Sequence, residues 1–302
     1  MALVLKFLNR LVMIYGAYLP HHRGKWRVVA ALIDWLKLER VYRGKIYNVD
    51  RGGISWKLNP ECLVHRTILY EGGYEPRESR WLSSVVRPGW KMIDVGANIG
   101  YFSMLVEKLS GGTADIYSFE PLGENFEYLN ENRRLNAFDR IRTYNMALGD
   151  RETELAFSVP SAGNTGQGRI LVEGENVAVD GLIERVRVTT LDAFVEENGI
   201  SGIDFIKMDV EGAEALVLAG ARSTILRDRP LMMIEINPEA LGEFQLTGED
   251  LIARISELGY DLFTVEPGQR LEPLTAATDL DPFRNAICFP KERATSERGG
   301  SR

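Results

Sequence analysis

From Trp90 onward, short apolar runs alternate with helical stretches, and this order constrains the fold more than any other feature of the sequence. Such alternation predicts a mostly parallel sheet covered by helices on both faces, a doubly wound α/β domain. The predicted strands are Lys91–Val95, Ile116–Phe119, Ile141–Ala147, Phe205–Val210 and Leu231–Ile236, and the predicted helices are Tyr101–Leu109, Glu124–Leu135, Ala213–Leu226 and Glu249–Leu258.

The chain before this domain reads differently and predicts an N-terminal α+β extension over residues 1–87. A helical pattern covers Trp26–Arg40, and the alternating segment Val41–Leu58 predicts a hairpin that turns at "DRGG". A short helix and the breaker Pro88–Gly89 then precede the first strong strand. We therefore expect one large domain at 88–290, followed by a charged tail at 291–302.

The composition excludes several classes of protein. The 302 residues carry a net charge of -7, so no global basic field is available to gather a nucleic-acid backbone. The two cysteines, Cys62 and Cys288, are too far apart for a CxxC motif and too few for a disulfide framework. We therefore expect a protein of a reducing compartment, the cytoplasm, that does not bind nucleic acid.

The first 18 residues predict an amphipathic helix rather than a signal peptide or a membrane span. Lys6 and Arg10 interrupt the apolar run, and no stretch approaches the roughly 20 apolar residues of a membrane span. An apolar stripe follows steps of three and four residues, and its members are Leu3, Phe7, Leu11, Ile14 and Tyr18. Two roles stay open: packing on the domain or a dimer mate, and contact with a membrane surface.

The stretch "KMIDVGANIG" predicts a ligand-binding turn between the first strand of the sheet and the following helix. Gly96 and Gly100 allow the backbone to approach a ligand closely, and Asn98 tolerates a left-handed backbone in the place of a middle glycine. A dinucleotide site needs G-x-G-x-x-G and a free helix N-terminus for its pyrophosphate. Asp94 would be poorly placed beside a phosphate, so the turn favours a ligand with positive charge.

An acid at the end of the second strand supports a nucleoside ligand of this kind. Glu120 in "YSFEP" follows the glycine turn by about twenty residues, where a carboxylate can accept hydrogen bonds from ribose hydroxyls. S-adenosylmethionine, with its sulfonium, amino-acid head and adenosine, fits both features.

In these motifs the sequence resembles the FkbM-type methyltransferases over about residues 75–265. The matching blocks are "IDVGANIGYFS", "SFEP", "NENRRLNA", "NMALGD", "TLDAF", "IKMDVEGAEALVLAGA" and "MMIEIN". The resemblance implies a seven-stranded Rossmann-like methyltransferase sheet and O-methyl transfer to a hydroxyl, often of a sugar or a polyketide. Ala97 and Pro121 lie in the matching blocks and join the expected cofactor residues.

Three further segments can be interpreted either as structural elements or as parts of the site. "NMALGD" would lay Asn145, Met146 and Ala147 along the adenine edge, although a buried strand end looks the same. The glycine-rich "SAGNTGQG", with Asn164, is either a surface loop or an element that closes on the acceptor. "TLDAF" predicts a helix start capped by Thr190 or Asp192.

The block "IKMDVEGAE" carries the candidate catalytic residues. Lys207 and Asp209 project to one face of a strand, and Glu211 is expected to open the next helix, where the dipole favours an acid. Asp209 is the strongest candidate, because a carboxylate that ends a buried strand is costly unless it is paired or lies in a cleft. Glu235 and Asn237 end the next strand on one face and are expected substrate contacts.

Two mechanisms stay open for these residues. Asp209 or Glu211 could act as the general base, with Lys207 or Asn237 holding the acceptor. Alternatively, Asp209, Glu235 and Asn237 could bind a divalent cation, although a plain hydrogen-bonding pocket is the favoured interpretation. His65 is a further base candidate, but a lone histidine is usually structural.

Two other functions are consistent with the fold class. An NAD-dependent oxidoreductase is disfavoured because Asp94 and Asn98 break the dinucleotide fingerprint. A catalytically silent binding protein would be expected to lose the glycine turn or "DVEG", and both are present.

Overall fold

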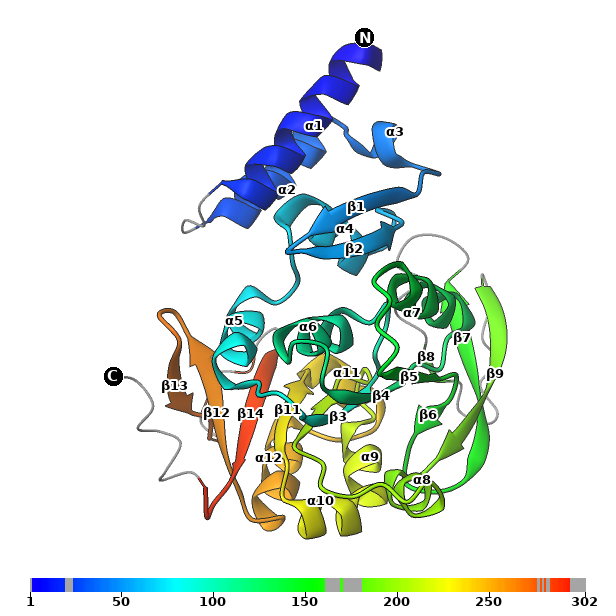
Figure 1. Cartoon of the computed structure of the whole chain (residues 1–302), viewed down its shortest axis with the longest axis vertical. Coiled ribbons are helices and arrows are strands. Elements are labelled where there is room, and N and C mark those ends of the chain that lie inside the picture. Colours follow the sequence, from blue (N-terminus) through cyan, green and yellow to red (C-terminus); the bar gives the residue numbers. More distant parts are fainter. Residues whose placement is uncertain are drawn as a thin grey trace.

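The centre of the molecule is an eight-stranded sheet in the order β13-β12-β14-β11-β10-β3-β4-β5 (Figure 1). The computed structural model describes residues 2–19, 24–160, 169–170, 181–275, 278, 280 and 283–293. β14 runs antiparallel to both of its neighbours and β13 runs antiparallel to β12, while the remaining strands share one direction. The strands are β3 (Lys91–Val95), β4 (Asp115–Phe119), β5 (Ile141–Tyr144), β10 (Phe205–Met208), β11 (Leu231–Ile236), β12 (Tyr260–Glu266), β13 (Arg270–Pro273) and β14 (Arg284–Pro290).

Helices cover both faces of this sheet, as the alternation predicts. Side chains of a strand alternate between the faces, so Met92 joins one buried cluster and Ile93 the other. The helices of the first face are α5 (Pro76–Val85), α6 (Tyr101–Leu109) and α7 (Gly123–Leu135), and those of the second are α8 (Leu191–Glu197), α9 (Glu214–Gly220), α10 (Arg222–Asp228) and α12 (Gly248–Glu257). The doubly wound, mostly parallel fold class is therefore confirmed, with β13 as an edge strand beyond the seven expected.

Two predicted elements of the large domain are split in the structure. The predicted helix Ala213–Leu226 forms two helices, α9 and α10. The chain packs closely at the end of α9, because a side chain on Gly220 would lie 1.9 Å from the Gly149 carbonyl oxygen. The predicted strand Ile141–Ala147 ends as β5 at Tyr144, and its last residue begins β6 (Ala147–Leu148) in a different sheet.

That different sheet is a four-stranded layer that the sequence analysis did not predict. Its order is β6-β9-β7-β8, and its longest pairing is antiparallel between β7 (Thr153–Pro160) and β9 (Gly181–Thr189). β8 (Arg169–Ile170) completes it. Its own buried cluster is small, with Leu122, Phe157 and Val186 as members.

The N-terminal extension has the predicted helical and hairpin parts. The hairpin turns at "DRGG", where Gly52 and Gly53 take positive φ values of 59° and 69°. The helical pattern over Trp26–Arg40 is realised as two helices. The elements are α1 (Ala2–Tyr18), α2 (Lys25–Trp35), α3 (Glu39–Tyr42), β1 (Tyr47–Arg51), β2 (Ile54–Leu58) and α4 (Leu63–Glu71).

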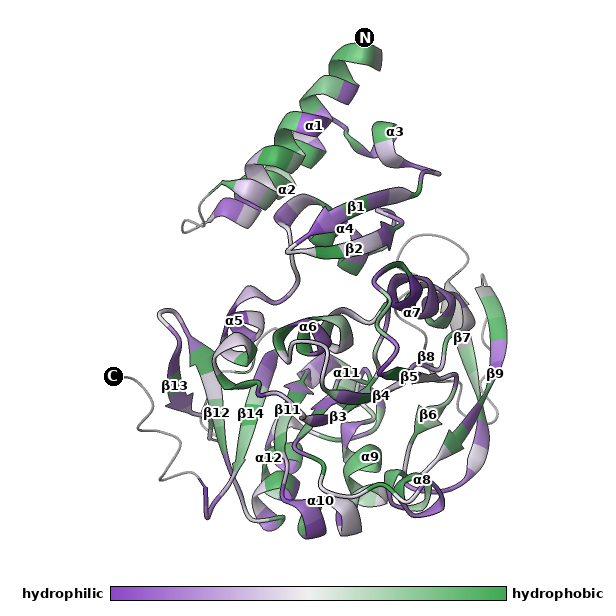
Figure 2. Ribbon diagram, in the orientation of Figure 1, coloured by the Kyte–Doolittle hydropathy of each residue, from purple (hydrophilic) through white to green (hydrophobic). Residues whose placement is uncertain are grey.

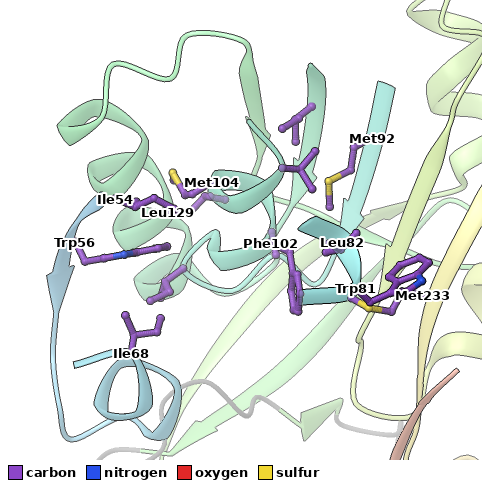
Figure 3. Close-up of a cluster of buried hydrophobic side chains, with 14 of the residues drawn as sticks. Ile54, Trp56, Ile68, Trp81, Leu82, Met92, Phe102, Met104, Leu129 and Met233 are labelled. Carbon is purple, nitrogen blue, oxygen red and sulfur yellow. The ribbon is translucent and has the colours of Figure 1, made fainter. Parts of the chain in front are cut away.

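One buried cluster runs from the extension into the large domain (Figure 3). Ile54, Trp56 and Ile68 of the extension share this cluster with Met104 of α6 and Leu129 of α7. The Trp56 ring also stacks on that of Tyr101, with centroids 5.8 Å apart. The extension thus packs on the same face of the sheet that α6 covers.

Two asparagines at the end of α7, Asn132 and the C-cap residue Asn136, connect the hairpin to the domain by hydrogen bonds. Asn132 Oδ1 accepts from the Lys57 backbone N–H, and Asn136 Oδ1 accepts from the Ser55 backbone N–H, each at 2.8 Å. Their spacing of four residues puts both amides on one side of α7, where they meet alternate residues of β2. The extension therefore has a defined position beside the carboxyl edge of the sheet.

Candidate active site

A cavity of about 1150 Å³ opens at the carboxyl edge of the central sheet. This is the edge at which open α/β sheets bind their ligands, and the volume exceeds the roughly 300–1,000 Å³ of a typical pocket for one small ligand. The predicted site residues that line it are Gly96, Ala97, Asn98, Glu120, Pro121, Ala147, Lys207, Asp209, Glu211, Glu235 and Asn237.

The glycine turn after β3 has the backbone geometry that its sequence predicts. Gly96 takes φ 75°, and a Cβ atom there would lie 1.8 Å from the carbonyl oxygen of Asp209. At Gly100, with φ 87°, a Cβ atom would lie 2.4 Å from a methyl group of Leu129. Asn98 adopts the left-handed conformation, with φ 50°. These glycines are therefore required by close packing as well as by backbone angle.

Every backbone N–H group from residue 96 to residue 100 is already bonded within the protein. The donors and acceptors are Gly96 and Ala97 to the Phe119 carbonyl oxygen (3.0 and 2.9 Å), Asn98 to Glu120 Oε2 (2.8 Å), Ile99 to Asn98 Oδ1 (2.9 Å) and Gly100 to the Ala97 carbonyl oxygen (2.8 Å). A pyrophosphate would need such groups free. The geometry therefore disfavours a dinucleotide at this turn.

Glu120 stands at the end of β4 and faces the cavity with a largely buried carboxylate. It is 4% exposed, and it accepts hydrogen bonds from the backbone N–H groups of Asn98 and Leu122 and, at 3.4 Å, from Asn125 Nδ2. Burial raises the pKa of Glu120 to about 7, although these hydrogen bonds act in the opposite direction. A carboxylate at this position can accept hydrogen bonds from a diol.

Asp94 lies behind the turn and is not among the residues that line the cavity. It is 1% exposed, Ser103 Oγ donates to its Oδ2 at 2.5 Å, and its Oδ1 is buried with no hydrogen-bond partner among the described residues. Burial raises the pKa of Asp94, against the charge of Lys207. Its effect on a ligand would thus be electrostatic.

In the "NMALGD" segment, Asn145 has a structural role, whereas the next two residues face the cavity. Asn145 Nδ2 donates to the carbonyl oxygens of Glu120 and Pro121, at 3.0 and 2.9 Å, and so holds the end of β4. Met146 and Ala147 line the cavity, whereas Asn145 is absent from the described lining.

Lys207 and Asp209 share one face of β10, as predicted. Lys207 Nζ lies 2.9 Å from Asp209 Oδ2 and 5.2 Å from the ring centroid of Phe102. Burial alone lowers the pKa of Lys207, but the carboxylates of Asp209, Asp94 and Glu75 together raise it above its ordinary value. Lys207 is therefore a fixed cation that orients the Asp209 carboxylate toward the cavity.

Three carboxylates meet on the same side of the cavity. Side-chain oxygens of Glu75, Asp209 and Glu235 lie within 4.8 Å of one another. Burial and the neighbouring carboxylates raise the pKa of Glu75 to about 8 and that of Glu235 to about 10, while Lys207 and a hydrogen bond with Asn285 lower the former. Glu75 is not among the residues predicted from the sequence; it precedes α5 and stands at the limit of the family resemblance.

The "DVEG" turn differs from its predicted form in one respect. α9 begins at Glu214, so Glu211 does not open the helix but lies in the preceding turn, with φ 53°, where it lines the cavity. Glu214 is the acid of the first helical turn, and its Oε1 accepts from the backbone N–H groups of Val210 and Gly212 at 3.0 and 3.3 Å. Gly212 is held against the Ala240 carbonyl oxygen, which leaves no room for a side chain.

Asn237 combines a position in the cavity with a capping role. It is the N-cap of α11 (Pro238–Glu243), and its Oδ1 accepts from the Ala240 backbone N–H at 3.3 Å. Asn237 therefore joins Asp209 and Glu235 at the cavity, but its oxygen is already engaged, and Glu75 supplies the third clustered carboxylate.

The remaining candidates lie elsewhere. His65 is buried in α4, accepts from the Asn59 backbone N–H at 2.9 Å and packs edge-on against Tyr128, and burial lowers its pKa to about 4. Its role is structural. Thr190 caps α8 as predicted, whereas Asp192 accepts from the first N–H groups of α10. Asn164 lies outside the described residues.

Several cavity residues come from segments that the sequence analysis did not connect to the site. The extension contributes Leu63, Val64, Thr67 and Tyr74, and the four-stranded sheet with its preceding turn contributes Arg151, Glu154 and Arg185. No local motif marks these residues, since only the packing of the extension and the second sheet brings them to the cavity.

A model of the FkbM methyltransferase domain matches residues 94–262, more than half of the chain. The chain belongs to the FkbM methyltransferase family. The 2-O-methyltransferase NoeI of Sinorhizobium fredii is 31% identical over 177 residues, which are 55% of this chain and 70% of that protein. The antimetabolite synthetase AmbE of Pseudomonas aeruginosa is 25% identical over 52% of this chain but only 9% of its own length.

Among solved structures, the methyltransferase FkbM of Methylobacillus flagellatus aligns with 94% of this chain at 17% identity and a TM-score of 0.44, and the alignment covers 58% of that structure. The family membership identifies an S-adenosylmethionine-dependent methyltransferase of the FkbM type. The described residues include no helix long and apolar enough to cross a membrane.

Proposed function

We propose that this methyltransferase transfers the methyl group to a hydroxyl of a sugar or glycan. The observation that carries the proposal is the Lys207–Asp209 pair, which places an oriented carboxylate in the cavity beside the glycine turn. The similarity to NoeI, named a 2-O-methyltransferase, favours an oxygen acceptor. When bound, S-adenosylmethionine supplies an electrophilic methyl group on a sulfonium.

The residues around the turn fit this cofactor. Glu120 would accept hydrogen bonds from the ribose hydroxyls, and Pro121, Met146 and Ala147 would line the adenine. The turn at residues 96–100 gives close backbone contact without free N–H groups for phosphate. The acidic surroundings, Asp94 among them, favour a cationic ligand.

Asp209 would act as the general base toward the acceptor hydroxyl. Lys207 holds its Oδ2, and the side chain remains 21% exposed toward the cavity, so a hydroxyl can approach the carboxylate. Asp209 would accept the hydroxyl proton as the oxygen bonds to the methyl carbon, and the electron pair of the broken carbon–sulfur bond would remain on the sulfur of the demethylated cofactor. Glu211, which lines the same cavity, is the alternative base.

The acceptor side of the cavity has the chemistry of a carbohydrate site. Tyr74 offers an aromatic surface, Arg185 and Arg151 offer donors, and Asn237 and Glu235 offer polar contacts. Planar rings and paired donors and acceptors suit a polyhydroxylated ring better than an apolar polyketide.

Transfer of label tests the proposal. Purified protein with methyl-labelled S-adenosylmethionine is screened against nucleotide sugars, lipid-linked glycans, polyketides and small phenols. Label in a sugar methyl ether supports the proposal. Transfer only to polyketides or phenols, or only to nitrogen or carbon atoms, would contradict the acceptor class.

We further propose that the outer face of α1 binds an anionic membrane surface. The inner face packs on α4, where Tyr70 donates to Asn9. The outer face is apolar and exposed, with Leu3 at 80% and Phe7 at 61%. Most of the α1 ribbon has the colour of hydrophobic residues (Figure 2). A surface hollow on this face is lined by Leu3, Val4, Phe7 and the cations Lys6 and Arg10. Apolar residues flanked by cations match an anionic lipid surface.

Vesicle binding tests this surface. We expect the protein to sediment with vesicles that contain phosphatidylglycerol, less with phosphatidylcholine alone, and not after Phe7→Ser with Ile14→Ser. Leu226→Ser, at an exposed apolar residue of α10, is the matched control. Binding that is indifferent to lipid charge or to the α1 changes would contradict the proposal, as would a dimer that the same changes dissociate.

A further inference from the structure

The three carboxylates at the acceptor side of the cavity come from separate parts of the chain. Glu75 precedes α5, Asp209 follows β10, and Glu235 lies on β11. Side chains of odd-numbered residues on β10 and β11 point to the face that α5 covers, so Lys207, Asp209 and Glu235 meet Glu75 there. Their oxygens lie within 4.8 Å of one another, and oxygens that bind one divalent cation are roughly 3 to 5 Å apart.

With all three carboxylates ionised, the cluster would have more negative charge than the protein balances. Lys207 pairs with Asp209 Oδ2, so three ionised carboxylates and one ammonium group would leave two negative charges. A divalent cation would balance this excess, whereas hydrogen-bonding to a neutral ligand would not.

One carboxylate oxygen of the cluster is buried without a hydrogen-bond donor in the part of the chain that the structure describes. Glu75 Oε2 is inaccessible to solvent and has no hydrogen-bond partner among the described residues. Glu235 is 8% exposed, yet it lines the cavity. A buried oxygen without a donor is costly unless a ligand engages it. The unpartnered oxygen of Glu75 thus indicates a ligand at this cluster.

We propose that Glu75, Asp209 and Glu235 bind one divalent cation of the Mg²⁺ or Mn²⁺ type at the acceptor side of the cavity. All the ligands are carboxylate oxygens, which such hard cations prefer. Asp209 contributes through the oxygen that Lys207 does not engage. Glu75 lies outside the matched residues 94–262, so this site is completed from the N-terminal side of the family domain.

The cation gives the site a second function beside charge balance. It would bind the acceptor hydroxyl and lower its pKa, which makes the oxygen a better nucleophile. In the cation-bound protein the hydroxyl proton would leave to solvent or to Glu211, the alternative base of the proposed function, because Asp209 would then serve as a ligand of the cation. This role rests on the proposed function, whereas binding of the cation does not.

Binding of Mn²⁺ alone tests the site without an acceptor. Full-length protein is treated with a chelator and desalted, and free Mn²⁺ is followed by electron paramagnetic resonance during titration. We expect one saturable site, at least 10-fold weaker binding in Glu75→Gln and in Glu235→Gln, and unchanged binding in Glu239→Gln. Glu239 is an exposed acid that lines the same cavity, so it matches the change in charge.

Thermal unfolding of the same proteins controls for folding. Mn²⁺ should raise the Tm of the wild type and of Glu239→Gln but not that of the two cluster variants, because a ligand stabilises only the protein that binds it. If a variant does not fold, Asp209→Asn replaces it in the same titration.

Two results would overturn the site: no saturable Mn²⁺ binding by the wild type, or binding that the cluster variants retain. The first would mean that protons balance the cluster. S-adenosylmethionine binding is measured on the chelated wild type in parallel. Cofactor binding without Mn²⁺ binding rejects the cation site and leaves the proposed function standing, whereas failure to bind the cofactor counts against the proposed function itself.

Discussion

Replacement of Glu120 tests how the cavity recognises its cofactor. Glu120 ends β4, lines the cavity and already accepts three hydrogen bonds from the protein. A carboxylate has about four lone-pair sites, so one is left for a ribose hydroxyl, and release of the long 3.4 Å hydrogen bond from Asn125 would supply a second. Glu120→Ala removes them all, and Glu120→Gln keeps one acceptor oxygen and removes the charge.

The expected loss of cofactor affinity follows from general hydrogen-bond energies and from the contacts of Glu120. Hydrogen bonds to a charged acceptor contribute about 1.5 to 3 kcal/mol, which corresponds to a loss of about 13- to 160-fold in affinity for Glu120→Ala. Part of this loss is indirect, since the Asn98 N–H group also loses its acceptor. Asn125→Ala removes only the 3.4 Å hydrogen bond to Glu120, and we expect it to change the affinity less than about threefold.

Titration calorimetry with S-adenosylmethionine and with its demethylated product measures these affinities. The pKa of Glu120 is about 7 because of burial, so the ionised acceptor is lost below that pH. We therefore expect wild-type affinity to fall as the pH decreases from 8 to 6, and the affinity of Glu120→Gln to stay constant. Wild-type affinity in Glu120→Ala, together with NAD binding, would show that Glu120 does not bind the ribose of S-adenosylmethionine.

Three further predictions concern catalysis, the turn and the buried histidine. Asp209→Asn should lower kcat by about 10²-fold or more while the cofactor Kd changes little, because it removes the base or a metal ligand; near-normal turnover with saturating acceptor would leave Asp209 only a partner of Lys207. Gly96→Ala should lower the free energy of unfolding by more than about 2 kcal/mol, because the added Cβ would meet the Asp209 carbonyl oxygen. The control Gly111→Ala has a similar φ and open space around it, so it should lower the free energy of unfolding only by the roughly 1 to 2 kcal/mol that a left-handed residue costs. Equal losses of Tm in the two variants would contradict this. His65 should stay neutral down to pH 5 in an NMR titration, since burial lowers its pKa to about 4; a midpoint near 6.5 would contradict its packing on Tyr128.

The sequence was sufficient to predict the doubly wound sheet but not everything attached to it. β3, β11 and α6 match their predicted bounds because each is a buried apolar run or an amphipathic repeat between clear breakers. β12, β13 and β14 were not predicted, and neither was the four-stranded sheet. In the latter, β9 alternates charged and apolar residues, a pattern that marks a strand only once its partner β7 is known.

Site residues could be predicted where their conformation or orientation is determined by the sequence of a single short segment. The φ of Asn98, the shared face of Lys207 and Asp209 and the position of Glu120 follow from strand alternation and turn chemistry. Glu75 could not be predicted, because an acid before a proline in a loop is ordinary, and only the path of the chain into α5 brings it to Asp209.

Methyl transfer to a sugar hydroxyl at the cavity that holds Asp209 can be observed in the product. S-adenosylmethionine with a ¹³C-labelled methyl group is incubated with the nucleotide-sugar or glycan acceptor found in the screen, and the product is followed by two-dimensional NMR. We expect a new methyl signal coupled through oxygen to one ring carbon of the sugar, formed by the wild type and lost in Asp209→Asn. A labelled methyl group on nitrogen or carbon, or the same O-methyl product at the same rate from Asp209→Asn, would contradict this expectation.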